Sequence, residues 1–466
     1  MKLIYQVHEK PSIPQTIVFA IQQLLAIMAA TLVVPMIING NANLVGDMAM
    51  SPAAALFGAG IGTFIYLLFT KFKSPVFLGS SFAFIGSMTA AFAGATTAAL
   101  GYLGLILGAF FAGLVYVCIS LAVKFAGVNW LNKLIPPVVI GPTVAIIGLS
   151  LSGNAIGDLV KGKVLDAAGN SVASPLLCVL CGLVTLFVVV ICSTYGKKSV
   201  KLIPFIIGIL AGYVVATIFT VIGNIANVDA MKIISYEPFK ALVADGVKLS
   251  TFFAIPSFTF VKAFGAFGEL SWSYVATVAV AYLPVSFVVF TEHVADHKNI
   301  SSIIGQDLLT EPGLKRTLLG DGVGSMAGAF FGGCPNTTYG ESVACVAISG
   351  NASVITILYT ACGAVLVSML SPFVAFINTI PSCVMGGVCI ALYGFIAVSG
   401  LKMISKLDLS QNKNLFVVST ILVCGVGGLS LTFGKVTITT VACSLILGIL
   451  MNLLLQNSKE ESQDEE

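Results

Sequence analysis

Charged residues are scarce in this sequence. Only 9% of its 466 residues are Asp, Glu, Lys or Arg, and Arg316 is the single arginine. Soluble domains carry roughly 25% charged residues, so the composition excludes a soluble multidomain protein of this length. The net charge of +3 is small and dispersed along the chain. The sequence therefore lacks the basic surface that a nucleic-acid partner would require.

Apolar sequence takes the place of the missing charge. Apolar residues make up 57% of the chain, and the mean hydropathy is +1.02. A helix needs about 20 consecutive apolar residues to cross a bilayer. Eleven segments fit this requirement or come near it: 15–38, 52–70, 101–123, 134–151, 175–193, 202–222, 272–294, 353–377, 383–400, 415–433 and 437–455. Three shorter apolar segments, rich in glycine and other small residues, are 76–93, 317–333 and 337–349.

The lysines support a count of fourteen spans with both termini in the cytoplasm. Positive residues concentrate in the cytoplasmic turns of membrane proteins. With fourteen spans, the short outside turns at 39–50, 94–100 and 334–336 carry no Lys or Arg. The basic residues of the short inside turns are Lys71, Lys73, Lys124, Lys133, Lys197, Lys198, Lys201, Lys298, Lys315, Arg316, Lys402, Lys406 and Lys413.

Two short motifs recur seven spans apart. The stretch IPPVVIG at 135–141 opens the fifth span, and IPSCVMG at 380–386 opens the twelfth. Likewise GSSF at 79–82 follows a proline before the third span, and NTTY at 336–339 follows a proline before the tenth. Because seven is odd, the two halves must lie inverted in the membrane. The sequence predicts an all-α polytopic membrane protein built as a 7+7 inverted repeat.

This architecture predicts where a ligand binds. In inverted-repeat carriers the site lies near the bilayer midplane, where short or broken helices meet. Helix N-termini there offer free backbone N–H groups and a positive dipole end. The third and tenth spans are the short ones, each predicted to be a strand followed by a half-helix. We therefore expect the ligand between Ser81-Phe82 and Tyr339-Gly340.

Few carboxylates lie in or near the predicted spans. A charge at the membrane centre costs on the order of 2.5–3.5 kcal/mol on insertion scales, so these residues are functional candidates. Glu292 and Asp296 lie four residues apart, on one helical face. Asp321 opens the ninth span, and Glu341 lies one turn into the tenth. The alternatives are a headgroup position for Asp296 and Asp321, and structural hydrogen bonding for Glu292 and Glu341.

The sequence gives no support for a metal, a cofactor or an enzyme. His293 and His297 are four residues apart, but their context EHVADH is not the zincin order HExxH. Cys178 and Cys181 lie in an apolar helix, where cysteine is usually a small hydrophobe. No GxSxG elbow or Walker A loop is present in the sequence. We expect a transporter without metal or cofactor.

Three motifs carry a family resemblance that runs nearly end to end. They are GSSFAF at 79–84, TEHV at 291–294 and PNTTYGE at 335–341. At these residues the chain resembles the nucleobase–ascorbate transporter family, also called nucleobase:cation symporter 2, and within it the bacterial members that carry uracil. The third motif is the most specific, because members that carry xanthine tend to have Gln at the position of Glu341.

The resemblance implies fourteen spans divided between a core domain and a gate domain, proton symport by alternating access, and a homodimer in the bacterial inner membrane. Spans 1–4 and 8–11 form the core, and spans 5–7 and 12–14 form the gate. The expected boundaries are 1–127 and 256–378 for the core, 128–255 and 379–458 for the gate, and 459–466 for an acidic cytoplasmic tail.

The chain departs from this family at four places. Gln22-Gln23 stand where a histidine is frequent in the first span, and 342–344 lack the usual Asn-x-Gly. Asp296 stands where uracil carriers commonly have histidine, and Asp321 also resembles the xanthine type. The choice of base therefore remains open between uracil and a xanthine-type purine.

Uracil offers two N–H donors and two carbonyl acceptors, which a buried carboxylate and free backbone amides complement. We expect Glu292 and Glu341 to accept from the base, and the amides of Phe82 and Gly340 to donate to it. The expected substrate site is Ser81, Phe82, Glu292, Tyr339, Gly340, Glu341 and Tyr393, with Phe82, Tyr339 and Tyr393 as its walls. The candidates for proton coupling are Glu292, Asp296, Asp321 and Glu341.

Three other classes stay open. An anion carrier of the same fold should have a basic group at the site, and the two half-helices contain no Lys or Arg. A channel would not need carboxylates at a closed site. An intramembrane enzyme would need a catalytic motif.

Overall fold

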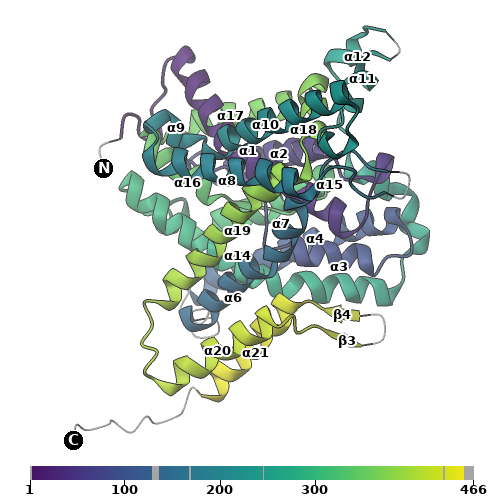
Figure 1. Cartoon of the computed structure of the whole chain (residues 1–466). Coiled ribbons are helices and arrows are strands. Elements are labelled where there is room, and N and C mark those ends of the chain that lie inside the picture. The colour runs from purple at the N-terminus through teal and green to yellow at the C-terminus, as the bar shows by residue number, and fades with distance from the viewer. Residues whose placement is uncertain (1–2, 128–135, 167–168, 245, 434–435, 456–466) are drawn as a thin grey trace, which may run out of the picture.

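The computed structural model describes residues 3–127, 136–166, 169–244, 246–433 and 436–455 (Figure 1). Ile135, the first residue of the repeated motif, lies outside these residues. So do the expected start of the gate domain at 128 and the acidic tail at 459–466.

Most of the described chain is helical. The longer helices are α1 (Ile13–Asn41), α2 (Pro52–Phe69), α4 (Ala98–Ala126), α6 (Pro137–Ser150), α8 (Pro175–Tyr195), α10 (Pro204–Ala226), α14 (Trp272–Ile304), α15 (Leu314–Gly332), α17 (Val354–Ser368), α19 (Ser382–Ile404), α20 (Asn412–Val426) and α21 (Thr440–Leu454). Shorter helices are α3 (Ile85–Ala93), α7 (Ser152–Leu159), α9 (Lys198–Leu202), α11 (Glu237–Val243), α12 (Leu249–Phe252), α13 (Thr259–Ala263), α16 (Gly340–Ser349) and α18 (Ser371–Thr379). The strands are β1 (Leu78–Ser80), β2 (Asn336–Thr338), β3 (Leu431–Phe433) and β4 (Val436–Ile438).

The helices have the length and composition of membrane spans. Within the described ranges, eight helices are long and apolar enough to cross a bilayer, and four shorter helices are also apolar. Their outward faces carry exposed large apolar side chains, among them Leu176, Phe187 and Ile225, which suits contact with lipid. The prediction of a helical, multi-pass membrane protein is confirmed.

Two predicted spans differ in detail from the helices. The segment 353–377 is divided into α17 and α18, because Pro372 cannot continue a helix and instead lies in the first turn of α18. The segment 415–433 is helical only to Val426, and its last residues form β3. Gly428 lies in the left-handed region there, with φ +75°, which ends the helix.

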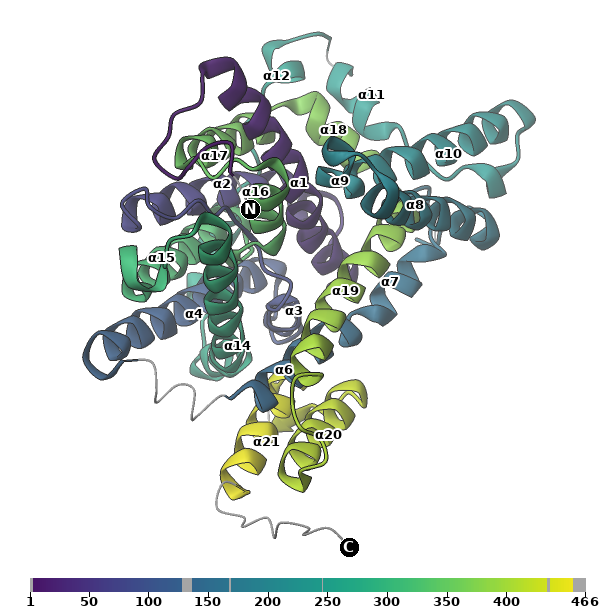
Figure 2. The same cartoon turned by 90° about the vertical axis from the view of Figure 1, so that its left-hand side faces the viewer.

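The helices pack into two groups. In the first, α2 packs on α15 and α17, α4 packs on α14 and α15, and α1 packs on α17. In the second, α19 packs on α6, α7 and α8, α10 packs on α8, and α20 packs on α6 and α21. Figure 2 shows the first group at the left and α8, α10, α20 and α21 at the right and bottom, with α19 running diagonally through the second group.

Two short strands cross inside the first group. β1 pairs antiparallel with β2, with Gly79 opposite Thr337 and Ser80 opposite Asn336. Each strand is followed by a short helix, α3 after β1 and α16 after β2. The crossing therefore brings together two helix N-termini from segments more than 250 residues apart in the sequence.

Glycines let α2 and α15 approach each other closely. A Cβ on Gly62 would meet the Asn336 side chain and lie 2.7 Å from the Gly324 carbonyl oxygen, and Gly58 similarly faces Gly328. Asn336 Nδ2 enters this seam and donates to the Gly58 carbonyl at 3.1 Å. Asn336 therefore anchors β2 at the contact between the two helices.

Gly62→Val is expected to destabilise the protein, because the added carbons have no space in the α2–α15 seam. Overpacking a core costs about 1–3 kcal/mol, so the melting temperature in detergent should fall clearly. Gly157→Val is the control: it is also helical, but its Cβ would meet nothing within 4 Å. Equal melting temperatures for the two variants would show that the seam tolerates a side chain.

Candidate functional site

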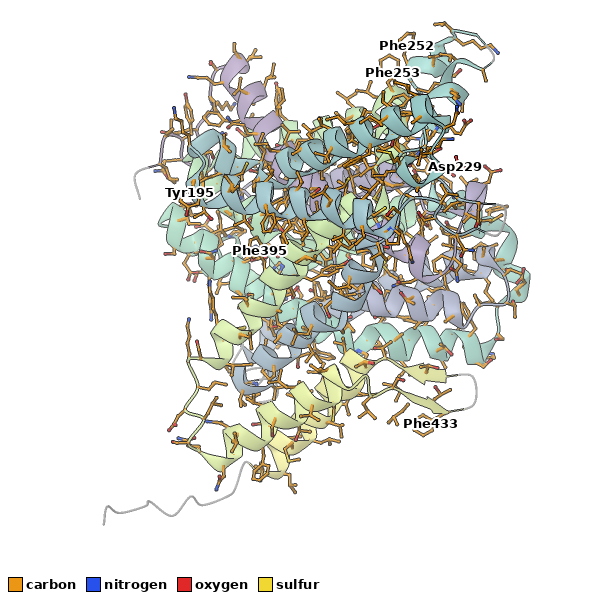
Figure 3. The ribbon with its side chains drawn as sticks, in the orientation of Figure 1. Tyr195, Asp229, Phe252, Phe253, Phe395 and Phe433 are labelled. Atoms are coloured by element: carbon orange, nitrogen blue, oxygen red, sulfur yellow. The ribbon has the colours of Figure 1, made fainter. Side chains whose placement is uncertain are left out.

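A cavity of about 590 Å³ lies between the two groups of helices, beside the β1–β2 crossing. The first group contributes residues from α1, the crossing, α14 and α16, which include all the carboxylates of the lining: Ala26, Ser81, Phe82, Ala83, Thr291, Glu292, Ala295, Asp296, Thr337, Thr338, Tyr339, Gly340, Glu341, Ala344, Cys345 and Ile348. The second group contributes Ile140, Val144, Ile147, Ser193, Lys201, Leu202, Pro204, Phe205, Leu392, Phe395, Ile396, Ser399 and Met403. Phe395 is labelled on α19 in Figure 3.

Backbone amides become available where the strand pairing ends. The Ser81 amide donates to the Pro335 carbonyl at 2.9 Å, and the Tyr339 amide donates to the Phe77 carbonyl at 3.2 Å. The next amides in each segment, those of Phe82 and Gly340, have no acceptor among the described residues. Both residues line the cavity. A ligand with two acceptor oxygens could satisfy these donors.

Three carboxylates share the cavity wall with these amides. Glu292 and Asp296 lie on one face of α14, and Glu341 lies in the first turn of α16, where a negative charge is favoured by the helix dipole. The Thr338 hydroxyl donates to Asp296 Oδ2 at 2.8 Å. Asp296 therefore belongs to the cavity wall, with α14 continuing beyond it to Ile304.

Asp321 lies away from the cavity. It is fully buried among protein groups on α15 (0% exposed). Its Oδ2 atom lies 2.6 Å from Nδ1 of His293, which is the residue after Glu292 on α14. Any role of Asp321 in proton coupling must therefore pass through its neighbours.

The three aromatic residues predicted to form the walls of the site differ in how they lie relative to the cavity. Phe82 lines the cavity, whereas Tyr393 is absent from the lining residues and lies behind Phe82, with ring centroids 6.1 Å apart. Tyr339 lines the cavity, but its hydroxyl donates to the Ser80 carbonyl at 2.7 Å. Ser81 is nearly buried and uses its amide in the crossing. The structure brings six of the seven predicted substrate-site residues together around the cavity.

The structure adds residues that the sequence did not indicate. Gln23 Nε2 donates to the Ser342 hydroxyl at 2.5 Å, and this hydroxyl accepts from the Phe77 amide at 3.0 Å. The link fastens α1 to the start of α16. The apolar wall from α6, α10 and α19 was also not predicted, because Phe205 and Phe395 lie in ordinary apolar stretches.

The described residues contain no cluster of three or more His, Cys, Asp or Glu side chains suited to a metal ion. His293 and His297 instead bond to protein groups on every ring nitrogen. The site can offer a ligand hydrogen bonds, an apolar wall and titratable carboxylates.

A bundle of apolar helices with a cavity between two helix groups is typical of membrane transporters. Residues 14–434 match the model of a family described as the Permease family, and the chain belongs to this family. The uracil permease of Bacillus caldolyticus is 35% identical over 99% of this chain and 97% of its own length. The uracil permease of Bacillus subtilis is 36% identical over 96% and 94%, and that of Escherichia coli K12 is 33% identical over 97% and 93%.

Solved structures share the fold at low identity. The transmembrane domain of the cyanobacterial bicarbonate transporter BicA matches with a TM-score of 0.59 and 14% identity, covering 96% of this chain and 99% of that one. The murine anion transporter Slc26a9 in the inward-facing state matches with a TM-score of 0.64 and 11% identity, covering 96% and 69%. These matches show the fold alone.

The family match and the named relatives confirm two predictions. The resemblance to the nucleobase–ascorbate transporter family is correct, and the chain is a transporter and not an enzyme.

Proposed function

We propose that this protein is a secondary active transporter that imports uracil by proton symport with an alternating-access mechanism. The observation that carries the proposal is the convergence of two free backbone amides, which follow the paired strands, and three carboxylates on one cavity. The proposal is further supported by relatives named as uracil permeases, which match the whole length of this chain.

The cavity complements a neutral, planar base. The amides of Phe82 and Gly340 donate to the two carbonyl oxygens of uracil, and the carboxylates of Glu292 and Glu341 accept from its two N–H groups. The Phe82 ring packs against the base. Each polar group of the ligand thus finds a partner when it leaves water, which a buried polar group requires.

The chain is proposed to cross the bacterial cytoplasmic membrane fourteen times as an inverted repeat, with cytoplasmic termini and a dimeric assembly. The two helix groups support a division into a core, 1–127 and 256–378, and a gate, 128–255 and 379–458. Each group unites segments from both halves of the sequence, as an inverted repeat requires.

Alternating access is supported by the position of the cavity between these groups. The cavity extends to Ser193, Lys201 and Ser399, which lie at the helix ends predicted to be cytoplasmic. The structure is therefore interpreted as inward-facing. Leu202 of α9 packs with Ala26 and Cys345 of the core in a small apolar cluster, where the two groups meet beside the cavity.

Proton coupling is proposed to use the cavity carboxylates. Glu292 and Asp296 share a helical face and a poorly solvated cavity, so simultaneous ionisation is unfavourable. A proton taken up by this pair changes the charge that the base encounters. Binding and protonation are then linked, which a symporter requires.

A xanthine-type purine is the second candidate. It is favoured by Asp296, which lines the cavity and is the residue type expected in xanthine carriers.

Competition for uptake separates the two candidates. We expect excess unlabelled uracil to abolish uptake of labelled uracil into vesicles that contain the protein, and xanthine and urate to leave most of it. Thymine tests whether a methyl group at the apolar wall is tolerated. A half-inhibitory concentration for xanthine well below that for unlabelled uracil would instead assign a purine substrate.

A further inference from the structure

α14 has a second polar face behind the cavity wall. Glu292 and Asp296 line the cavity, whereas His293 and His297 are fully buried (0% exposed). The two imidazole rings stack with centroids 4.1 Å apart. His297 contacts the His293 carbonyl and the Tyr66 hydroxyl. His293 is the ring that faces a carboxylate, and the proposed substrate contacts do not use it.

The number of protons on the His293–Asp321 pair depends on the direction of the Thr317 hydroxyl. Its Nε2 lies 3.0 Å from Thr317 Oγ1, and the Thr317 hydroxyl donates to the Leu314 carbonyl at 3.1 Å. With its own hydrogen directed there, Thr317 can only accept from Nε2, so Nε2 carries a hydrogen. Nδ1 and Asp321 Oδ2 are 2.6 Å apart, and two acceptors do not approach so closely without a proton between them. In this state the pair is neutral overall.

A second state fits the same heavy-atom positions. A hydroxyl hydrogen rotates freely, so Thr317 can turn from the Leu314 carbonyl and donate to Nε2 of His293. Nδ1 then carries the ring hydrogen and donates to an ionised Asp321. This state holds one proton fewer and has a net charge of −1. The two states differ by one proton and by the direction of one hydroxyl.

The surroundings of the pair contain few other charges. The titratable groups close enough to interact with it are Tyr66 from α2, Tyr116 from α4, and Glu292, Asp296 and His297 from α14. Lys315 and Arg316 begin α15 at the cytoplasmic end. The second oxygen of Asp321 and the Tyr116 hydroxyl are buried, and neither has a partner in the described part of the chain. An extra charge on the pair is therefore poorly compensated and sensitive to Glu292.

We propose that the His293–Asp321 pair is a proton-binding site of the transport cycle, and that Thr317 is the positioning residue that lets the pair gain and lose one proton in place. Glu292 precedes His293 and lines the cavity, so a charge on the pair is coupled electrostatically to the proposed substrate site. This inference rests on the proposed proton symport, and it adds His293 and Thr317 to the residues that couple protons to uracil.

Thr317→Val tests the proposal, because valine has the same shape but neither donates to nor accepts from Nε2. In vesicles that contain the full-length variant, we expect accumulation of labelled uracil under an imposed pH gradient to fall about tenfold, the effect of one buried hydrogen bond. Uracil exchange at equal pH should fall much less. Thr317→Ser restores the hydroxyl and should rescue accumulation. Thr360→Val, a buried threonine whose hydroxyl donates to the Thr356 carbonyl, controls for the loss of a hydroxyl elsewhere.

The uptake measurements distinguish failure of the proton-site proposal from failure of the proposed proton symport. If the parent protein accumulates uracil and Thr317→Val accumulates it equally well, the proposal is wrong. If the parent itself does not respond to the pH gradient, proton symport fails. If Thr317→Val loses exchange as well, the pH profile of uracil binding to the purified proteins decides. If the midpoint pH of uracil binding differs between Thr317→Val and the parent protein, and Thr317→Ser restores the parent value, the proton site is supported. An unchanged midpoint pH in Thr317→Val refutes it.

Discussion

Glu341→Gln is expected to weaken uracil binding by roughly 1.5–3 kcal/mol, the value of a hydrogen bond to a charged group. The dissociation constant should therefore rise by about 10- to 100-fold. Glu341 lines the cavity in the first turn of α16, next to the free amide of Gly340. Glutamine has nearly the same shape, but its amide nitrogen adds a donor where the base also donates. Calorimetry on the purified protein measures the change directly.

Glu237→Gln is the matched control for this experiment. Glu237 is exposed on α11 and pairs with Lys240 at 2.6 Å, so the same chemical change should leave binding unaltered. Unchanged affinity in Glu341→Gln would remove this residue from the site and leave Glu292 as the acceptor from uracil.

Asp296→Asn should abolish most of the uracil accumulation driven by a pH gradient, while exchange of uracil across the membrane persists. Asn keeps the size of the side chain and can still accept from the Thr338 hydroxyl, which bonds Asp296 at 2.8 Å. It cannot take up a proton. If Asp296 shares a proton with Glu292, the loss of this carboxylate uncouples the gradient from transport.

The accumulation ratio of labelled uracil in vesicles with an imposed pH gradient is the quantity to measure. Asp229→Asn serves as control, because Asp229 lies at the periphery in Figure 3 and pairs with Lys232. Accumulation by Asp296→Asn that equals the parent protein would place the coupled proton on Glu292, on Glu341 or on the His293–Asp321 pair, without Asp296.

The sequence predicts helices and candidate site residues better than their contacts. Apolar length locates the helices, and the unusual polarity of Glu292 and Glu341 in apolar surroundings identifies them as candidates. The crossing of β1 and β2 follows from no local signal, because strands of three residues have no detectable period. Only the repeated motifs at 79–82 and 336–339 indicated that these segments correspond.

Asp321 illustrates what the sequence cannot supply. Its position near the start of an apolar helix fits either a headgroup location or a buried site, and the choice depends on which neighbour faces it. That neighbour is His293, a contact over 28 positions in the sequence. The same limit applies to Gln23 and Ser342, whose hydrogen bond joins residues 319 positions apart. Local sequence patterns contain no information on contacts between residues so far apart in the chain.

The two walls of the cavity differ in chemistry, and this has a consequence for motion. The wall around Val144, Phe205 and Ile396 is apolar, and its polar residues Ser193, Lys201 and Ser399 lie toward the helix ends that the sequence predicts to be cytoplasmic. Dispersion contacts have no preferred direction, so a base held by the proposed amides and carboxylates of the opposite wall can move along this apolar wall without breaking a directed bond. The apolar wall therefore adds little to the energy barrier for movement of the base along it. Substitutions in the polar wall can thus change which base binds, while substitutions in the apolar wall can change how fast it moves.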